Sequence, residues 1–321
     1  MPKYSLIIPV YNRPEEIEEL LESLTHQIYK DFEVIVVEDG SSRPSENIVR
    51  SYYDKLSIKY LTKKNSGPGL SRNYGAVHAQ GLFLIFLDSD CVIPKGYLRA
   101  VDEFLTETPV DCFGGPDMAD PEFNVMQKAV SYAMTSFFTT GGIRGGKKRI
   151  GKFLPRSFNM GYSSKVFEAT SGFSSIRYGE DIDMTLRIIK KGFKTALIPE
   201  AYVYHKRRTD LRKFFNQVYQ SGKARLVLFQ LHPESLKPVH FLPTAFTLGA
   251  AFLLILSLFY PVALAPLLFY LMLVLIDASI RNSSFFTGLF SVAASVTQLT
   301  GYGTGFISGC IQLISKKKKP D

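Results

Sequence analysis

The chain has 321 residues, 46% of them hydrophobic, and this proportion excludes an intrinsically disordered protein. Its 38 basic and 29 acidic residues give a net charge of +9, but residues 241–276 carry no charge at all. The composition therefore predicts a water-soluble N-terminal part followed by a lipid-facing C-terminal part. The three cysteines show no Cys-x-x-Cys spacing, so neither a zinc site nor a disulfide scaffold is indicated.

Short apolar runs alternate with helical patterns over residues 1–90. Strands are predicted at 4–10, 32–37, 58–61 and 82–87, and helical segments within 13–24, 48–53 and 67–79. Apolar strands that alternate with helices are typical of a parallel sheet covered on both faces. The pattern predicts an α/β fold that is Rossmann-like, with a mostly parallel sheet.

The predicted strands end in polar residues, namely Asn12 after the first, Asp39 after the second, and Asp88 and Asp90 after the fourth. In open sheets of this kind, ligands bind at the carboxyl ends of the strands. This recurrence predicts a nucleotide or phosphate ligand at that edge of the sheet.

The segment Asp88–Ser89–Asp90 has the form Asp-x-Asp and directly follows an apolar strand. Two carboxylates there can hold a hard divalent cation and leave positions for diphosphate oxygens. Such a cation offsets the charge on a departing nucleotide diphosphate. The alternative is a solvated loop without a ligand.

Basic residues are concentrated in 142–213, where 17 Lys and Arg stand against 6 Asp and Glu. Duplex binding is disfavoured, because the acidic groups at the strand ends would repel a phosphate backbone. We therefore expect no nucleic-acid partner. A pyrophosphate-bearing substrate or an anionic membrane surface agrees better with this charge.

The C-terminal third predicts membrane association. Residues 209–231 form an amphipathic pattern, typical of a helix in the membrane interface or of one packed on a soluble core. Pro261 divides the uncharged run into two predicted spans, 242–260 and 262–280. Residues 284–314, with glycines near their middle, could form a third span or a re-entrant or interfacial segment, and the second is favoured because both ends of the chain are expected on the same side of the membrane.

The predicted orientation follows from the two ends of the chain. The apolar run at the N-terminus is too short for a signal peptide, so the soluble part is expected in the cytoplasm. The basic tail, 316–321, should also stay cytoplasmic, which requires an even number of crossings. The expected location is the cell (inner) membrane, with the soluble domain on its cytoplasmic face.

Five motifs in a fixed order resemble glycosyltransferase family 2, whose members have the GT-A fold. They are Pro9–Val10–Tyr11–Asn12, Glu38–Asp39–Gly40–Ser41, Gly67–Pro68 with Ser71–Arg72–Asn73, Asp88–Ser89–Asp90, and Gly179–Glu180–Asp181. The resemblance covers about 4–230.

The resemblance implies a division of the chain into domains. A catalytic domain would occupy 1–230, with a nucleotide-binding half at about 1–115 and an acceptor half at about 116–230. The membrane region would follow at 241–315.

The resemblance also implies a nucleotide-sugar donor, usually uridine-linked, on the first half of the sheet. The residues implied at the base, ribose and phosphates are Pro9, Tyr11, Glu15, Asp39, Gly67, Arg72, Asp88 and Ser89. Asp39 would accept a hydrogen bond from uracil or ribose. The alternative for Arg72 is a structural ion pair.

The metal ligands and the catalytic base are likewise implied by the resemblance. Asp90 would bind Mn²⁺ or Mg²⁺, with Asp88 and His205 as further candidate ligands. Asp181 would deprotonate the acceptor hydroxyl, and attack from the opposite face would invert the anomeric centre. Glu180 would orient the acceptor or the loop. The alternative for this pair is two carboxylates stabilised by a helix dipole.

The Gln-x-x-Arg-Trp signature of processive polysaccharide synthases is missing, and the chain has no tryptophan. Transfer of one sugar at a time, from a UDP-sugar to a lipid-linked or glycan acceptor, is therefore the expected function. Two alternatives stay open. One is a polyprenyl-phosphate sugar synthase, and the other is a non-catalytic membrane scaffold of the same fold.

Overall fold

The computed structural model describes residues 1–118, 120, 123–141 and 153–317, with the side chains of 316 and 317 outside the description. The chain divides into two compact units. The first comprises Met1–Asp120 and Phe153–Lys206, and the second comprises Pro121–Lys152 and Arg207–Asp321.

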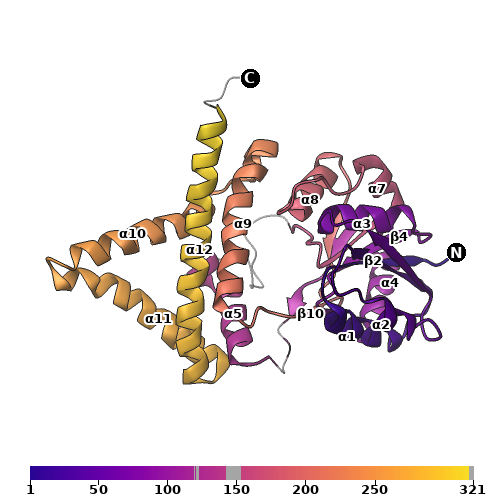
Figure 1. Ribbon diagram of the computed structural model, residues 1–321, viewed down its shortest axis with the longest axis horizontal. Coiled ribbons are helices and arrows are strands. Elements are labelled where there is room, and N and C mark those ends of the chain that lie inside the picture. The colour runs from indigo at the N-terminus through magenta and orange to yellow at the C-terminus, as the bar shows by residue number, and fades with distance from the viewer. Residues whose placement is uncertain (119, 121–122, 142–152, 318–321) are drawn as a thin grey trace. The chain divides into compact units, whose positions relative to one another are not determined.

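A seven-stranded sheet forms the centre of the first unit (Figure 1). Its strands, in spatial order, are β3 (Ile58–Lys63), β2 (Phe32–Asp39), β1 (Tyr4–Val10), β4 (Phe83–Leu87), β8 (Asn159–Ser163), β6 (Cys112–Gly114) and β9 (Thr195–Leu197). The first four are mutually parallel, and β8 pairs antiparallel with both β4 and β6. The predicted α/β class and the mostly parallel sheet are confirmed.

Helices cover both faces of this sheet. They are α1 (Pro14–Thr25), α2 (Glu46–Arg50), α3 (Pro68–Val77), α4 (Tyr97–Glu107), α7 (Ser164–Thr170) and α8 (Glu180–Lys190). Successive side chains of β1 enter opposite cores: Leu6 and Ile8 pack in one, and Ile7 packs in the other. Burial on both faces explains why the strands are continuously apolar.

A small second sheet holds the segments after β4 and before α9 together. It contains β5 (Cys91–Val92), β10 (Val203–His205) and β7 (Asp117–Met118). The antiparallel pairing of β10 with β5 places His205 opposite Cys91. Residues far apart in the sequence are thereby brought next to the Asp-x-Asp turn.

The second unit is helical. Its helices are α5 (Val125–Thr135), α6 (Phe137–Thr140), α9 (Leu211–Leu231), α10 (Leu242–Leu256), α11 (Ala265–Asn282) and α12 (Phe285–Lys317), with 3₁₀ turns at Pro233–Ser235, Pro238–Phe241 and Pro261–Leu264. Two segments, Pro238–Leu256 and Pro261–Asn282, are long and apolar enough to cross a membrane, and only 11% of each is buried. They meet at the Pro261 turn, as the two predicted spans do.

Of the alternatives predicted for 284–314, the re-entrant hairpin is wrong, because α12 is one continuous helix of 33 residues, whereas a third span or an interfacial helix stays a prediction. The glycines of this helix do not mark a turn. They allow neighbouring helices to pack closely against it. A Cβ on Gly301 or Gly305 would collide with α9, and one on Gly303 would collide with α10. Small residues allow such close backbone approach.

Helix α9 packs within the helical unit, and the first unit ends at Lys206. The predicted catalytic domain, 1–230, extends beyond this unit and stays a prediction. Phe214 and Val218 of α9 share an apolar cluster with Ala129 and Val130 of α5 and with Ala294 of α12. Residues 123–141 belong to the same unit. Residues 142–152, part of the basic segment, and 318–321 of the basic tail lie outside the described residues.

Candidate active site

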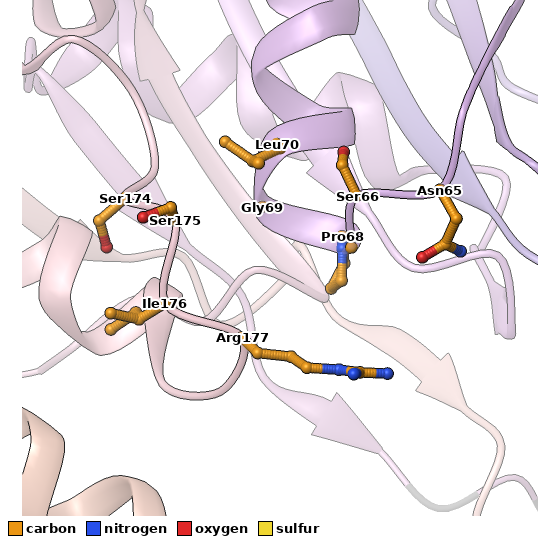
Figure 2. Close-up of a pocket in the computed structure, with 10 residues that line it drawn as sticks. Asn65, Ser66, Pro68, Gly69, Leu70, Ser174, Ser175, Ile176 and Arg177 are labelled. Carbon is orange, nitrogen blue, oxygen red and sulfur yellow. The ribbon is translucent and has the colours of Figure 1, made fainter.

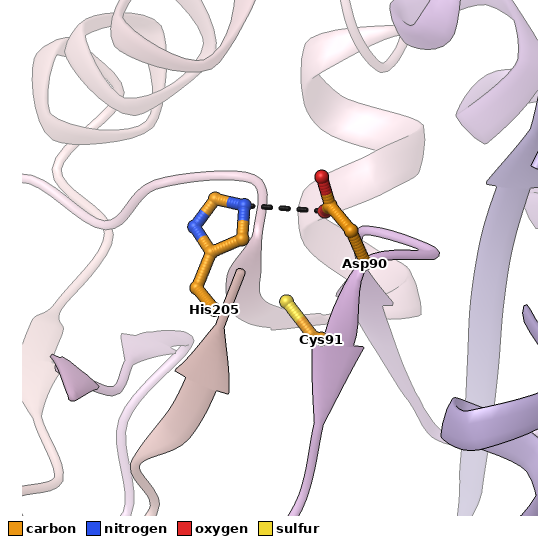
Figure 3. Close-up of side chains that lie close together, drawn as sticks. All are labelled: Asp90, Cys91 and His205. Atoms are coloured by element: carbon orange, nitrogen blue, oxygen red, sulfur yellow. Dashed lines mark ion pairs between the residues drawn. The ribbon is translucent and has the colours of Figure 1, made fainter. Parts of the chain in front are cut away.

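The turn between β4 and β5 places Asp90 beside His205 (Figure 3). Asp90 Oδ1 lies 3.2 Å from His205 Nε2, and the Arg13 guanidinium pairs with Asp90 Oδ2. The Lys206 amide donates to the Asp90 carbonyl oxygen at 3.0 Å. The Phe158 ring stacks on the His205 imidazole, with centroids 5.1 Å apart. These contacts orient both side chains.

The donor atoms of Asp90, Cys91 and His205 all lie within 4.8 Å of one another, close enough for one metal ion. A thiolate is a soft ligand that favours metals such as zinc or copper, so Asp90 and His205 are the candidate ligands for a harder ion. The remaining carboxylate and imidazole suit Mn²⁺, whereas Mg²⁺ prefers an all-oxygen shell. The residues present therefore fit a divalent metal ion.

Arg72 links the Asp-x-Asp turn to the start of α8. Its Nη2 donates to Asp88 Oδ1 at 2.6 Å and its Nη1 donates to Glu180 Oε1 at 3.1 Å. The guanidinium also lies over the Phe173 ring, 5.4 Å from its centroid. With only 2% of its surface exposed, Arg72 is a buried bridge between two carboxylates. Asp88 and Asp90 thus have different partners.

Glu180 and Asp181 open helix α8, which follows Gly179 at a φ of +84°. Asp181 Oδ2 accepts from Arg156 Nε at 2.6 Å, and Oδ1 accepts from the Ile182 amide at 2.8 Å. Burial alone would raise the pKa of Asp181, but Arg156 and the amide hold it below its ordinary value. Burial and the Asp181 charge raise the pKa of Glu180 to about 7. The two carboxylates therefore differ in their protonation.

Asp39 lies at the end of β2 and binds the loop that precedes α3. Its carboxylate accepts from the Ser66 and Gly67 amides, each at 2.9 Å, and from Lys63 Nζ. Two of these bonds go to Oδ1 and one goes to Oδ2, so Oδ2 has acceptor capacity left.

A cavity of about 290 Å³ lies between this loop and the segment before α8 (Figure 2). It is lined by Asn65, Ser66, Gly67, Pro68, Gly69, Leu70, Ser174, Ser175, Ile176 and Arg177. Ser66 and Gly67 connect the cavity to Asp39, and a Cβ on Gly69 would lie 3.1 Å from Glu180 Cγ. The cavity lining therefore includes two residues bonded to Asp39 and one, Gly69, whose backbone lies close to the Glu180 side chain.

The remaining residues predicted at the donor are Pro9, Tyr11, Glu15 and Ser89. Pro9 lies near the end of β1. Tyr11 directly follows this strand and is 52% exposed. Glu15 forms an exposed ion pair with Arg43. Ser89 is buried between Asp88 and Asp90.

Three basic residues of these clusters are absent from the sequence-based prediction: Arg13, Lys63 and Arg156. Lys63 ends β3, so the strand-end pattern could have revealed it. Arg13 precedes α1 and Arg156 precedes β8, and nothing in the local sequence indicates their acidic partners.

Fold and acidic clusters together define a GT-A-like α/β protein with its polar groups at the carboxyl ends of the strands. Residues 5–169 match the model of the family described as "Glycosyl transferase family 2". The chain belongs to this family, as the sequence predicts.

Among its relatives is the poly(ribitol-phosphate) beta-N-acetylglucosaminyltransferase TarS of Staphylococcus aureus, which is 40% identical over 111 residues. The match covers 33% of this chain and only 19% of TarS. The GalNAc(5)-diNAcBac-PP-undecaprenol beta-1,3-glucosyltransferase of Campylobacter jejuni is 35% identical over 117 residues, or 36% of this chain and 38% of the relative.

Two solved structures share the fold. The mannosyltransferase PcManGT from Pyrobaculum calidifontis, in complex with GDP-Man and Mn²⁺, has a TM-score of 0.65 at 19% identity, covering 93% of this chain and 87% of its own. TarS 1–349 in complex with UDP-GlcNAc has a TM-score of 0.54 at 22% identity, covering 97% of this chain and 92% of its own.

Proposed function

We propose that this glycosyltransferase is inverting and manganese-dependent, and that it moves one sugar from a UDP-sugar to a hydroxyl of a lipid-linked or glycan acceptor. The observation that carries the proposal is the Asp181 carboxylate, held by Arg156 and the Ile182 amide at the start of α8 beside the Asp88–Arg72–Glu180 bridge. An ionised carboxylate can accept the proton of an attacking hydroxyl. The bridge connects this base to the Asp-x-Asp turn, where we place the donor diphosphate.

The donor is assigned to the Asp39 side of the sheet. Asp39 Oδ2 has acceptor capacity for an N–H or hydroxyl group of the nucleoside, and the neighbouring cavity can take part of the donor. Pro9, Tyr11, Glu15, Gly67 and Ser89 keep the roles at the donor that the sequence motifs suggest. The uridine base is supported by the TarS complex with UDP-GlcNAc, whereas PcManGT was solved with GDP-Man.

Asp90 and His205 are the proposed metal ligands, and the second carboxylate oxygen of Asp88 is a candidate third. A bound Mn²⁺ supplies positive charge that stabilises the departing nucleotide diphosphate. Arg13, which pairs with Asp90, contributes a second positive charge at the same carboxylate.

The transfer needs one base and no covalent intermediate. The Asp181 carboxylate takes the proton of the acceptor hydroxyl as its oxygen attacks the anomeric carbon from the face opposite the diphosphate. The new carbon–oxygen bond forms while the bond to the diphosphate breaks, and the diphosphate leaves with the electron pair. Attack from the opposite face inverts the configuration. Glu180, tied to Arg72, orients the acceptor side of the site.

Release of nucleotide diphosphate by the purified full-length protein tests the function. UDP-glucose, UDP-galactose, UDP-N-acetylglucosamine and GDP-mannose are each supplied with Mn²⁺, with and without a membrane lipid extract. We expect release from one UDP-sugar that depends on the lipid. Release from GDP-mannose alone would reject the uridine donor, and a failure of every donor together with a failure to bind UDP would favour the non-catalytic scaffold.

The apolar helices α10 and α11 are proposed to anchor the protein in the cytoplasmic face of the membrane. The turn between them has no charge, and Leu258, Phe259 and Val262 expose 74–79% of their surface. Burial of such side chains in lipid is favourable, by about 25 cal/mol for each Å² removed from water. A lipid-linked acceptor agrees with this anchoring.

A tryptophan placed at the turn reports its depth without background, because the chain has no tryptophan. In Phe259→Trp, we expect blue-shifted fluorescence that is quenched in vesicles containing brominated lipids. Quenching by bromines near the headgroup or near the chain end indicates how deep the turn inserts. Tyr53→Trp, at a position 44% exposed in the first unit, is the control and should stay unquenched. Equal behaviour of the two variants contradicts the insertion.

A further inference from the structure

Two arginines contact the carboxylate pair at the start of α8: Arg72 binds Glu180 and Arg156 binds Asp181. They differ in how much of the guanidinium is buried and already bonded. Both terminal nitrogens of Arg72 are used, one by Asp88 and one by Glu180, and its side chain is 3% exposed. Arg156 contacts Asp181 through Nε alone, and its side chain is 33% exposed. Arg156 is therefore the arginine at this carboxylate pair that a substrate can reach.

The contact with Asp181 uses only the Nε atom of the Arg156 guanidinium. A guanidinium has five N–H donors in a plane, and Nε uses one of them. In the part of the chain that the structure describes, Nη1 and Nη2 of Arg156 form no hydrogen bond or ion pair. These donors suit two oxygens of one phosphate group, since arginine binds phosphate in a bidentate manner.

The charge around Asp181 makes such a contact necessary for an anionic acceptor. Asp88, Glu180 and Asp181 place three carboxylates in this region, and Arg72 is already shared between two of them. A phosphate that approached Asp181 would be repelled at short range without a second cation. The exposed edge of Arg156 is the cation that adjoins the base directly.

We propose that Arg156 is a positioning residue with two contacts: Nε orients the Asp181 carboxylate, and Nη1 and Nη2 bind a phosphate of the acceptor. This inference rests on the proposed function, in which Asp181 is the base, and adds the chemical class of the acceptor. One side chain would then fix the acceptor and the base relative to each other. The phosphate belongs to a lipid diphosphate or to a phosphodiester polymer, and the names of the relatives contain both groups.

The test compares phosphorylated and neutral acceptors in the full-length protein. The acceptors are a polyprenyl-diphosphate-linked sugar, an oligomer of ribitol phosphate and a neutral decyl glycoside. In Arg156→Gln, we expect the ratio of kcat/KM for the phosphorylated acceptor to that for the neutral one to fall about tenfold or more, the value of a charge-assisted contact. Arg156→Lys keeps the charge but loses the fork, so it should recover only part of the ratio. The phosphorylated acceptor that shows the effect identifies the source of the phosphate.

Decyl phosphate, which has no sugar hydroxyl, gives a second readout as an inhibitor. Its inhibition constant should rise about tenfold in Arg156→Gln and stay unchanged in Arg99→Gln, an exposed arginine on α4. Equal losses on all acceptors, with unchanged inhibition, would mean that Arg156 acts only through Asp181 and would overturn the phosphate site. Failure of the proposed function looks different: Asp181→Asn would transfer as well as the unmodified protein, whatever residue occupies position 156.

Discussion

Asp181→Asn is expected to lower kcat for sugar transfer by roughly a hundred- to ten-thousandfold, the usual contribution of a general base. Asparagine keeps the size of the side chain and one oxygen for the Ile182 amide, but it cannot take up a proton. Donor binding should change little, because Asp181 lies on α8, whereas Asp39 and the Asp-x-Asp turn, which are proposed to bind the nucleoside and the diphosphate, lie at the ends of β2 and β4. The measurement is kcat for transfer together with the dissociation constant of UDP.

Glu180→Gln is the matched control, since it removes the neighbouring carboxylate from the same helix turn. We expect less than about a tenfold loss, because Glu180 orients and does not accept the proton. If Asp181→Asn transfers at an unchanged rate, the base assignment is wrong. A polyprenyl-phosphate sugar synthase would then be favoured, because a phosphate acceptor is already ionised and needs little base catalysis.

The pH dependence distinguishes the two carboxylates as bases. A base works when it is deprotonated, and Asp181 has a pKa below its ordinary value, so kcat/KM should stay flat from neutral pH down to about pH 5. Glu180 has a pKa of about 7, so a reaction that used it as the base would slow about tenfold for each pH unit below that value. An acid limb near neutral pH would therefore reassign the base to Glu180.

Asp90→Asn is expected to lower kcat/KM by roughly a thousandfold, since metal stabilisation of developing charge contributes several kcal/mol and each 1.36 kcal/mol is tenfold. The variant should also lose stimulation by Mn²⁺ and bind Mn²⁺ more weakly in the presence of UDP, as measured by electron paramagnetic resonance. Asparagine is a weaker ligand than a carboxylate, and the charge that pairs with Arg13 is removed.

Cys91→Ala is the control for Asp90→Asn, because Cys91 is the third member of the same cluster. Its soft sulfur is not a proposed ligand for Mn²⁺, so Mn²⁺ affinity should stay within about twofold of the unmodified value. Thermal unfolding of both variants shows whether either change destabilises the fold. Full metal-dependent activity in Asp90→Asn would remove Asp90 from the metal site.

Local sequence patterns were sufficient for the class and the edge of the sheet that carries the polar groups. The strand at Tyr4–Val10 and the helix from Pro14 follow from apolar periodicity and from a proline at a helix start, which depend on near neighbours alone. Asp39 ends β2, and Asp90 comes shortly after β4. The carboxyl ends of parallel strands lie at the same edge of a sheet, so the sequence predicts that these two residues lie at one edge. The family motifs add specificity because they occur in a fixed order.

The partner of each carboxylate was decided only by the tertiary structure. Asp88 pairs with Arg72, Asp90 with Arg13 and His205, and Asp181 with Arg156. Residues 90 and 205 meet because β10 pairs with β5, a contact between segments more than a hundred residues apart. Such pairings arise from sheet closure and loop paths, which no local periodicity records.

The role of the glycines in the helical unit also depends on the tertiary structure. Gly301, Gly303 and Gly305 read locally as a break, because glycine weakens an isolated helix by about 1 kcal/mol relative to alanine. In the folded chain they lie inside α12, where their missing side chains admit the backbones of α9 and α10. The sequence by itself determined the family, the parallel sheet and the two apolar helices. The tertiary structure decided the ion-pair partners and the continuity of α12, because both depend on contacts between distant segments.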